Sequence, residues 1–463
     1  MHILFISEYY PPKIMGGGEI NLQTIAHALA KENHTISILT AKFPHLPTHE
    51  TLNNVHIYRT LKTGTTPNSL IQNLKRRIFF PPSIIKQTIS LIRKLQKTNQ
   101  PPIDIIHFIG PSIIAAKQLK RTLNNLYIHQ YSKSFLEEFD KCYRVNQTPL
   151  KTHPKTKNIP LFATIESYPA LCPKGDRFYK SKHACPHICT LQKFLICQQQ
   201  STEIGKIQNH WYLKYNPLFL FSIYHYYKQL NSSLQHCHLI AISAYVQTLL
   251  TQQQHQSIII PNALDIKPFQ NAAKQLTQKS DNIINNKKKP TLLYLGSLTA
   301  FKGPQIILQA IKNLNVHLDL YSDGSLKSEL QTYITQHHID ATIHPPVAYT
   351  QIPQLYQHAD IILFPSLWPE PFGRIPIEAH AAGKIVIASN SGAIPETISP
   401  NDFLVPPGDP QTLHNTIQKI IEEKIKKKSK PNTENLTQYQ EKNIAHRLIN
   451  AYQKEITSQK EIS

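Results

Sequence analysis

The 463-residue sequence has no uninterrupted apolar run of about 18 residues, the length that a membrane-spanning helix requires. Its opening, MHILFISEYYPP, lacks a basic leader, and its apolar run is only strand length, so no secretory signal is predicted. Six cysteines are too few for a disulfide scaffold in so long a chain. We therefore expect a protein of the reducing cytoplasm.

Acidic residues are scarce, since 29 Asp and Glu stand against 50 Lys and Arg, for a formal net charge of +21. This balance favours an anionic partner, such as nucleic acid, a membrane surface or phosphorylated small molecules. Nucleic acid is the least favoured, because no nucleic-acid-binding motif is present and the basic residues are spread along the chain. Most of the lysines are explained by a solvated surface alone.

Two halves of the chain each open as a strand, a loop and a helix. MHILFIS is followed by a Pro/Gly loop and a helical pattern over 20–33, and PTLLYLGSL is followed by TAFKGP and QIILQAIKNL. Strands that alternate with helices predict parallel sheets with crossover helices. We expect an α/β fold of two Rossmann-like, doubly wound domains facing a cleft, with ligands at the carboxyl ends of the strands.

The domain boundaries follow from where this alternation is interrupted. We expect a first domain over 1–256 with an insertion at about 130–235, a second domain over 257–435, and a C-terminal helix over 436–463. The insertion contains a Cys/His cluster and the aromatic run HWYLKYNPLFLFSIYHYY.

The stretch EPFGRIPIE holds two carboxylates, Glu370 and Glu378, with seven residues between them. An ionised carboxylate accepts two hydrogen bonds side by side, and a vicinal diol offers two donors at that spacing. Because Pro376 suits a first helical position, a helix is predicted to start near Arg374, with Glu378 in its first turn. Free amides at that start form an anion site, and Gly373 allows close approach. The alternative is that Glu378 is only a favourable helix-start acid.

The wider stretch PSLWPEPFGRIPIEAHAAGKIVIASNSGAIPETI resembles the signature of family-4 retaining glycosyltransferases of the GT-B fold, also called glycosyl transferases group 1. YLGSLTAFKG resembles their phosphate loop, SAYVQTLL with IIIPNALDIKPF the segment before it, and YYPPKIMGGGE their N-terminal glycine loop. The resemblance covers nearly the whole chain, with the middle least well matched. It implies a first domain for the acceptor and a second domain for a nucleotide-sugar donor.

The resemblance also implies a role for each matched residue. Glu378 would bind the ribose hydroxyls, Glu370 would contact the donor sugar, and Lys302 would neutralise the diphosphate, whose growing charge must be stabilised as it leaves. Three loops would hold sugar and phosphate through Phe372, Gly373, Arg374, Gly296, Ser297, Gly16 and Gly17. The sequence has no Asp-x-Asp motif, so metal-assisted phosphate handling is not expected.

Two positions depart from the family pattern. Ser297 stands where many members carry Arg, so Lys302 must act alone or with another cation, for which Arg374 is a candidate. TIESYPALCP places Glu166 where many members carry a His that contacts the donor sugar. Glu166 could bond a hydroxyl or stabilise positive charge at the reacting carbon, or it could be a structural acid. His107 could instead lie near the cleft.

Four cysteines fall within 26 residues: Cys172, Cys185, Cys189 and Cys197. The Cys-x3-Cys spacing within them is compatible with zinc, and four thiolates could close a tetrahedral structural site. Buried free thiols are the alternative. A catalytic metal is not expected.

Residues 75–80, KRRIFF, place three cations beside three apolar residues, which is compatible with peripheral contact with an anionic membrane. The apolar stripe over 85–97 could serve the same purpose, or it could be the core-facing side of a helix whose basic side is solvated.

These observations predict a cytoplasmic, metal-independent, retaining glycosyltransferase that moves a sugar from a nucleotide-diphosphate sugar to a glycan or lipid-linked acceptor. Cell-surface polysaccharide or glycolipid synthesis is the expected setting. A glycogen- or sucrose-type synthase or a phosphorylase on the same fold is a rival. Ser297 and Glu166 favour another rival, a degenerate, non-catalytic protein that binds a sugar nucleotide or glycan.

Overall fold

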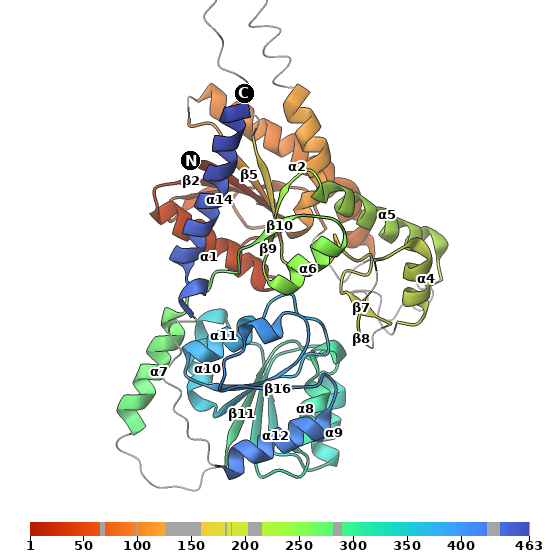
Figure 1. Cartoon of the computed structure of the whole chain (residues 1–463), viewed down its shortest axis with the longest axis vertical. Helices are drawn as coiled ribbons and strands as arrows, with labels where there is room; N and C mark the ends of the chain where they lie inside the picture. The colour runs from red at the N-terminus through yellow and green to blue at the C-terminus, as the bar shows by residue number, and fades with distance from the viewer. Residues whose placement is uncertain are drawn as a thin grey trace, which may run out of the picture.

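The computed structural model describes residues 1–64, 70–98, 100–125, 159–180, 183–186, 188–201, 215–280, 289–423 and 436–462. Much of the predicted insertion, at 126–158 and 202–214, lies outside these ranges, as does the charged segment before the last helix. The described chain forms two α/β domains stacked along the long axis of the molecule (Figure 1). The predicted fold class is confirmed.

The first domain is built on an eight-stranded sheet of order β10-β9-β6-β5-β1-β2-β4-β3, in which only β3 runs antiparallel to its neighbour. Its strands are β1 (His2–Ser7), β2 (Thr35–Ala41), β3 (His49–Leu52), β4 (Val55–Leu61), β5 (Ile105–Ile109), β6 (Leu161–Ile165), β9 (His238–Ala241) and β10 (Ser257–Ile259). Its helices include α1 (Gly17–Lys31), α2 (Leu70–Lys97), η1 (Gly110–Ala115), α5 (Pro217–Leu234) and α6 (Ala244–Gln252). Because β10 pairs with β9, this sheet extends past the boundary predicted at 256.

The second domain contains a six-stranded, wholly parallel sheet of order β13-β12-β11-β14-β15-β16. Its strands are β11 (Thr291–Leu295), β12 (His317–Tyr321), β13 (Ala341–His344), β14 (Ile361–Phe364), β15 (Ile385–Ser389) and β16 (Phe403–Val405). Its helical elements are α7 (Lys267–Ser280), η3 (Ala300–Lys302), α8 (Pro304–Ile311), α9 (Lys327–Gln336), η4 (Tyr349–Gln351), α10 (Ile352–His358), α11 (Arg374–Ala381), η5 (Ile394–Thr397) and α12 (Pro410–Glu422).

Both sheets are covered on both faces, which explains why their central strands read as continuous apolar runs. In β11, Leu293 and Leu295 face one core cluster and Leu292 and Tyr294 face another. The first cluster includes side chains from α7, α10 and α11, and the second includes side chains from α8, α9 and α12. This doubly wound arrangement brings the loops after β11 and β14 to one edge of the sheet.

The last helix, α14 (Glu441–Ile462), follows η6 (Thr437–Tyr439) and returns to the first domain, where it packs along α1 (Figure 1). Its Tyr452 is fully buried, and its hydroxyl lies 2.5 Å from Nδ1 of His107. The Nε2 atom of His107 lies 2.8 Å from the Thr164 hydroxyl, and burial lowers the pKa of this histidine to about 3. The alternative that placed His107 near the cleft is therefore wrong, since the ring is enclosed by the sheet and α14.

Among the described residues, no helix has the length and apolar character needed to cross a membrane. The stripe over 85–97 belongs to α2, and its Ile89 and Leu95 are buried in the core of the first domain. The core-facing interpretation of this stripe is confirmed.

Candidate active site at the domain boundary

The loop between β14 and α11 carries Glu370 in a fixed position. The residue is 5% exposed, and its carbonyl oxygen accepts a hydrogen bond of 2.7 Å from the Ala393 N–H. Gly392, at φ 61°, makes this approach possible, because a Cβ atom there would lie 2.4 Å from the Glu370 carbonyl oxygen. The turn after β15 therefore helps to hold the Glu370 loop in place.

Lys302 reaches Glu370 from the loop that follows β11. Its Nζ atom lies 2.6 Å from Oε1 of Glu370 and 4.4 Å from the centre of the Trp368 ring. Gly303, at φ 77°, brings the two loops together, because a Cβ atom there would lie 2.1 Å from the Pro365 carbonyl oxygen. The Lys302 side chain is 21% exposed, so the ammonium group is oriented by its neighbours and still accessible to an anion.

The second acid, Glu378, lies on α11 in a cluster of polar side chains. Its Oε1 atom accepts hydrogen bonds of 2.7 Å from both Arg374 and the Tyr349 hydroxyl, and Oε2 accepts one of 3.2 Å from Tyr356. Burial lowers the pKa of Arg374, but the charges of Glu378 and Tyr349 and the hydrogen bonds to them together outweigh this effect and raise it. Burial, followed by the Glu378 charge, raises the pKa of Tyr349.

The predicted helix start at Arg374 is correct, but the placement of Glu378 in the first turn is wrong. Because α11 begins at Arg374, Glu378 lies one turn later, at the i+4 spacing that allows the ion pair with Arg374. Both carboxylate oxygens already accept hydrogen bonds, so a ribose diol would have to share or replace these donors.

The glycine loop of the first domain meets this helix at the boundary between the two domains. A Cβ atom on Gly17 would lie 3.9 Å from Cδ and Nη1 of Arg374, so the start of α1 adjoins α11. Gly16 precedes α1, and a Cβ atom there would meet nothing within 4 Å. The fold therefore brings Gly17 to the edge of the second domain, with Gly16 as the residue before it in the chain.

Glu166 follows β6 and lies beside the same glycine loop. Its Oε1 atom accepts a 2.8 Å hydrogen bond from Asn21 of α1, and Oε2 would lie 2.4 Å from a Cβ atom on Gly18. Burial raises the pKa of Glu166 to about 7, with a smaller contribution from the charge of Glu19 and an opposing one from Asn21. Glu166 is thus a carboxyl group poised to change its protonation state near neutral pH.

Several contacts join the two domains around the Glu370 loop. The Tyr168 hydroxyl donates to the Pro369 carbonyl at 2.5 Å, and the Ser243 hydroxyl donates to the Pro371 carbonyl at 2.8 Å. Glu396 accepts 2.7 Å hydrogen bonds from the first two backbone N–H groups of α6. The loop is therefore held by the first domain as well as by its own.

Residues 277–442 match the family model described as glycosyl transferases group 1. The chain carries a group 1 glycosyltransferase domain. The prediction of a group 1 glycosyltransferase domain is confirmed for these residues.

Curated relatives are similar over different shares of their length. The uncharacterized glycosyltransferase MJ1607 of Methanocaldococcus jannaschii is 21% identical over 91% of this chain and 89% of its own length. Spore coat protein SA of Bacillus subtilis is 27% identical over 35% of this chain. The matched part covers only 48% of the length of that protein.

Solved structures share the fold of this chain over nearly its whole length. Sucrose-phosphate synthase of Thermosynechococcus elongatus superposes with a TM-score of 0.67 at 18% identity, over 99% of both chains. Anabaena HepE in complex with UDP superposes with a TM-score of 0.59 at 17% identity, over 98% of this chain and 100% of that one.

The remaining predicted donor-site residues lie in the same loops of the group 1 domain. Ser297 is exposed, and its hydroxyl lies 3.1 Å from that of Thr299, so the position supplies no cation. Gly296 is packed against Tyr294, and Phe372 is 9% exposed. A Cβ atom on Gly373 would lie 2.2 Å from the Thr397 hydroxyl, so this glycine permits close packing. The roles assigned to these residues stay predictions.

Sequence reasoning missed the partners that orient the site: Asn21, Tyr349, Tyr356, Trp368 and Glu396. Trp368 lies within the quoted signature and could have been noticed as an aromatic ring two residues before Glu370. Tyr349 and Tyr356 lie in η4 and α10, before β14 and outside the quoted signature. No local sequence pattern connects them with Glu378.

We expect Glu166→Gln to change how the stability of the protein depends on pH. Because the folded-state pKa of Glu166 is raised from 4.5 to about 7, the folded protein loses stability relative to the unfolded chain as pH rises through that window. Gln cannot ionise, so the variant should gain up to about 3 kcal/mol over the wild type between pH 5 and pH 8. Urea unfolding at both pH values measures this difference, and an equal effect at both would contradict it.

Gly18→Ala tests the same carboxyl group by steric displacement. The new methyl group would force the Glu166 carboxylate away from its place beside Asn21, so the pH dependence of stability should change. Gly16→Ala is the matched control, since its methyl group meets nothing within 4 Å and should leave that dependence as in the wild type. Indistinguishable unfolding curves for the two variants would contradict the placement of Glu166.

Proposed function

We propose that the protein transfers a sugar from a nucleotide-diphosphate sugar to an acceptor hydroxyl with retention of anomeric configuration. The observation that carries the proposal is the 2.6 Å pair of Lys302 and Glu370, placed at the carboxyl ends of two neighbouring strands. The Lys302 ammonium would interact with the diphosphate, and Glu370 would then accept hydrogen bonds from the hydroxyls of the donor sugar.

The reaction breaks the bond between the anomeric carbon and the diphosphate oxygen and forms a bond to the acceptor oxygen. The departing diphosphate takes the proton of the acceptor hydroxyl on the same face of the sugar, so the configuration is retained. Lys302 and backbone amides near the start of α11 would stabilise the negative charge that develops on the diphosphate. Glu166, from the opposite domain, would lie on the acceptor side of the cleft.

The donor is proposed to carry a uracil base, since HepE, which shares this fold, forms a complex with UDP. Glu378 would then hold the ribose, with Arg374 and Tyr349 orienting its carboxylate. The test is release of free nucleotide from a panel of UDP-, GDP-, ADP- and TDP-sugars, followed by NMR of the anomeric proton in the product. Turnover with retention is expected, and nucleotide binding without turnover would instead favour a non-catalytic protein.

The acceptor is proposed to be a lipid-linked glycan on a cell-surface pathway. Four large apolar side chains on α2 and α5 support contact with a membrane: Ile78, Phe79, Leu218 and Phe221, which are 53%, 50%, 81% and 61% exposed. Arg77 joins the two helices, donating a 2.7 Å hydrogen bond to Ser222 of α5. The net charge of +21 would favour an anionic lipid surface.

The KRRIFF segment contributes less to this surface than its sequence suggested. Arg76 forms an ion pair with the buried Glu8, and Phe80 is fully buried, so neither is available to lipid. The exposed residues of the segment are Lys75, Ile78 and Phe79.

Vesicle flotation tests the membrane proposal. The wild type should float with phosphatidylglycerol vesicles at low salt, and the double variant Leu218→Ser/Phe221→Ser should remain in the soluble fraction. Leu404→Ser, which removes an exposed apolar side chain of the second domain, is the matched control and should float. Failure of the wild type to float would contradict the proposal without affecting the donor site.

A further inference from the structure

A cysteine-rich segment projects from the first domain between β6 and α5 (Figure 1). Its described part contains β7 (Phe178–Tyr179), β8 (His183–Ala184) and α4 (Leu191–Gln199). Four of its side chains line a single small cavity: Cys172, Cys185, Cys189 and Cys197. None of the four forms a disulfide, and they come from three different parts of the segment, so the fold has gathered them in one place.

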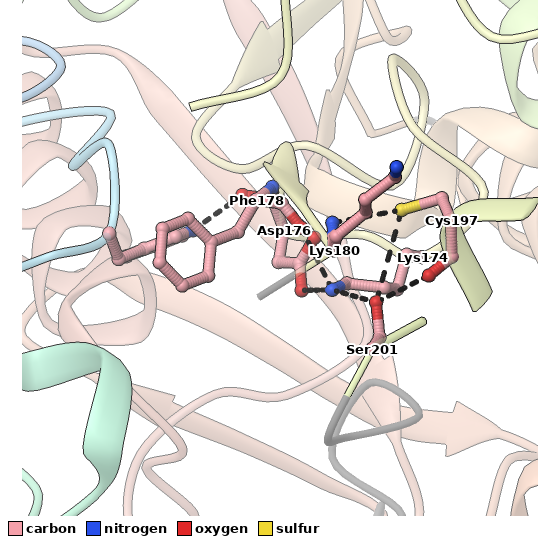
Figure 2. A network of polar contacts seen from close by, with 7 residues as sticks. Lys174, Asp176, Phe178, Lys180, Cys197 and Ser201 are labelled. Atoms are coloured by element: carbon pink, nitrogen blue, oxygen red, sulfur yellow. Dashed lines mark hydrogen bonds and ion pairs between the residues drawn. The ribbon is translucent and has the colours of Figure 1, made fainter. Parts of the chain in front are cut away.

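The backbone of the same segment contacts one of these thiols. The Lys180 N–H donates a hydrogen bond to the Cys197 sulfur at 3.4 Å (Figure 2). The four cysteines therefore share one cavity, and at least one of them is oriented by the surrounding backbone.

We propose that these four cysteines bind one zinc ion in a closed, structural site. Four thiolates are a complete tetrahedral ligand set for zinc, and binding would release the four thiol protons to solvent. No three Cys, His, Asp or Glu side chains in the described part of the chain already stand close enough to share an ion. The sulfur atoms must therefore move closer together across the cavity when the metal binds.

The proposed site lies next to the interdomain contact that orients Lys302. The Asp176 carbonyl, on the rim of the cavity, accepts a 2.5 Å hydrogen bond from Nε1 of Trp368. Trp368 in turn lies under the Lys302 ammonium. Lys174 contacts two residues of the rim. Its Nζ atom donates a 2.8 Å hydrogen bond to the Phe178 carbonyl and forms a 3.1 Å ion pair with Asp176 (Figure 2).

Zinc would thus stabilise the surface against which Trp368 is held. This consequence rests on the proposed donor site, whereas the metal site itself does not. If both hold, removal of zinc should raise the KM for the nucleotide sugar more than it lowers kcat, because the donor-binding loop loses support from the first domain.

The experiment measures zinc in the full-length protein, purified with reductant and without chelator from zinc-supplemented medium. One zinc ion per chain is expected in the wild type, with loss of most of it in Cys185→Ser and in Cys189→Ser. Cys237→Ser is the matched control, because Cys237 is a free thiol outside the cavity and should leave the zinc content unchanged.

A second measurement keeps the proposal falsifiable if the cysteine variants fold poorly. Wild-type protein stripped of metal should bind Co²⁺ and develop the visible absorption of a tetrahedral cobalt thiolate. The proposal would be overturned if the wild-type protein contained no zinc while its four cavity cysteines were reduced. It would also be overturned if neither Cys185→Ser nor Cys189→Ser changed the zinc content. Thiol counting that shows these cysteines paired in disulfides would overturn it as well. Each result is independent of activity, so a failed donor site would not be mistaken for a failed metal site.

Discussion

Lys302→Ala is expected to lower kcat by roughly 100-fold or more while the protein stays folded, since loss of one preorganised group at a developing charge typically costs about 3 kcal/mol of barrier. The Lys302 Nζ atom lies 2.6 Å from Glu370, and the side chain is still partly exposed. An incoming diphosphate could therefore reach the ammonium group. Steady-state release of nucleotide measures the effect.

Two further variants separate chemistry from folding in this experiment. Lys289→Ala removes a lysine from an exposed pair with Asp340, 2.9 Å away, and should leave turnover unchanged. Lys302→Ala leaves Glu370 buried and unpaired, so Lys302→Ala/Glu370→Gln should recover stability without recovering turnover. Wild-type turnover in Lys302→Ala would contradict the role given to this lysine.

Glu378→Ala is expected to destabilise the fold by roughly 3 kcal/mol, because it leaves the partly buried Arg374 without its counter-charge. The loss should be clearly larger than in Tyr349→Phe, which removes only hydrogen bonds to the same cluster and should cost about 1 kcal/mol. Urea unfolding measures both, and equal losses would show that the ion pair is not the dominant contact.

Ligand binding distinguishes the ribose role of Glu378 from this structural one. At a temperature where the variant is folded, Glu378→Ala should weaken binding of UDP but leave binding of inorganic diphosphate unchanged. Lys302→Ala should weaken both ligands. Parallel loss of both ligands in Glu378→Ala would mean that Arg374, released from its partner, has disturbed the phosphate site.

The sequence was informative where local patterns determine the structure. Central strands such as β1 and β11 are buried on both faces, so they appear as unbroken apolar runs that predict a parallel sheet. The start of α11 was predictable because glycine and proline favour particular backbone positions. The glutamates, Lys302 and the N-terminal glycines were assigned to one site through the resemblance to family-4 glycosyltransferases, and the carboxyl ends of parallel strands are where such a site is expected.

Contacts between distant segments could not be predicted in this way. Asn21 and Glu166 are 145 residues apart, and neither the α1 pattern nor the strand pattern of β6 connects them. His107 resembled a cleft residue in the sequence, but α14, more than 300 residues later, encloses it. The return of α14 to the first domain is a tertiary packing choice that amphipathic periodicity alone does not specify.

The most direct test of the donor site is a thermal-shift titration of wild type and Lys302→Ala with UDP-, GDP-, ADP- and TDP-sugars. A ligand that binds only the folded protein stabilises it by about 2.7 kcal/mol at 100 times its Kd. We predict that at least one of these donors raises the Tm of the wild type and that Lys302→Ala loses most of that shift. No shift with any donor, or an equal shift in both proteins, would contradict a nucleotide-sugar site built around Lys302.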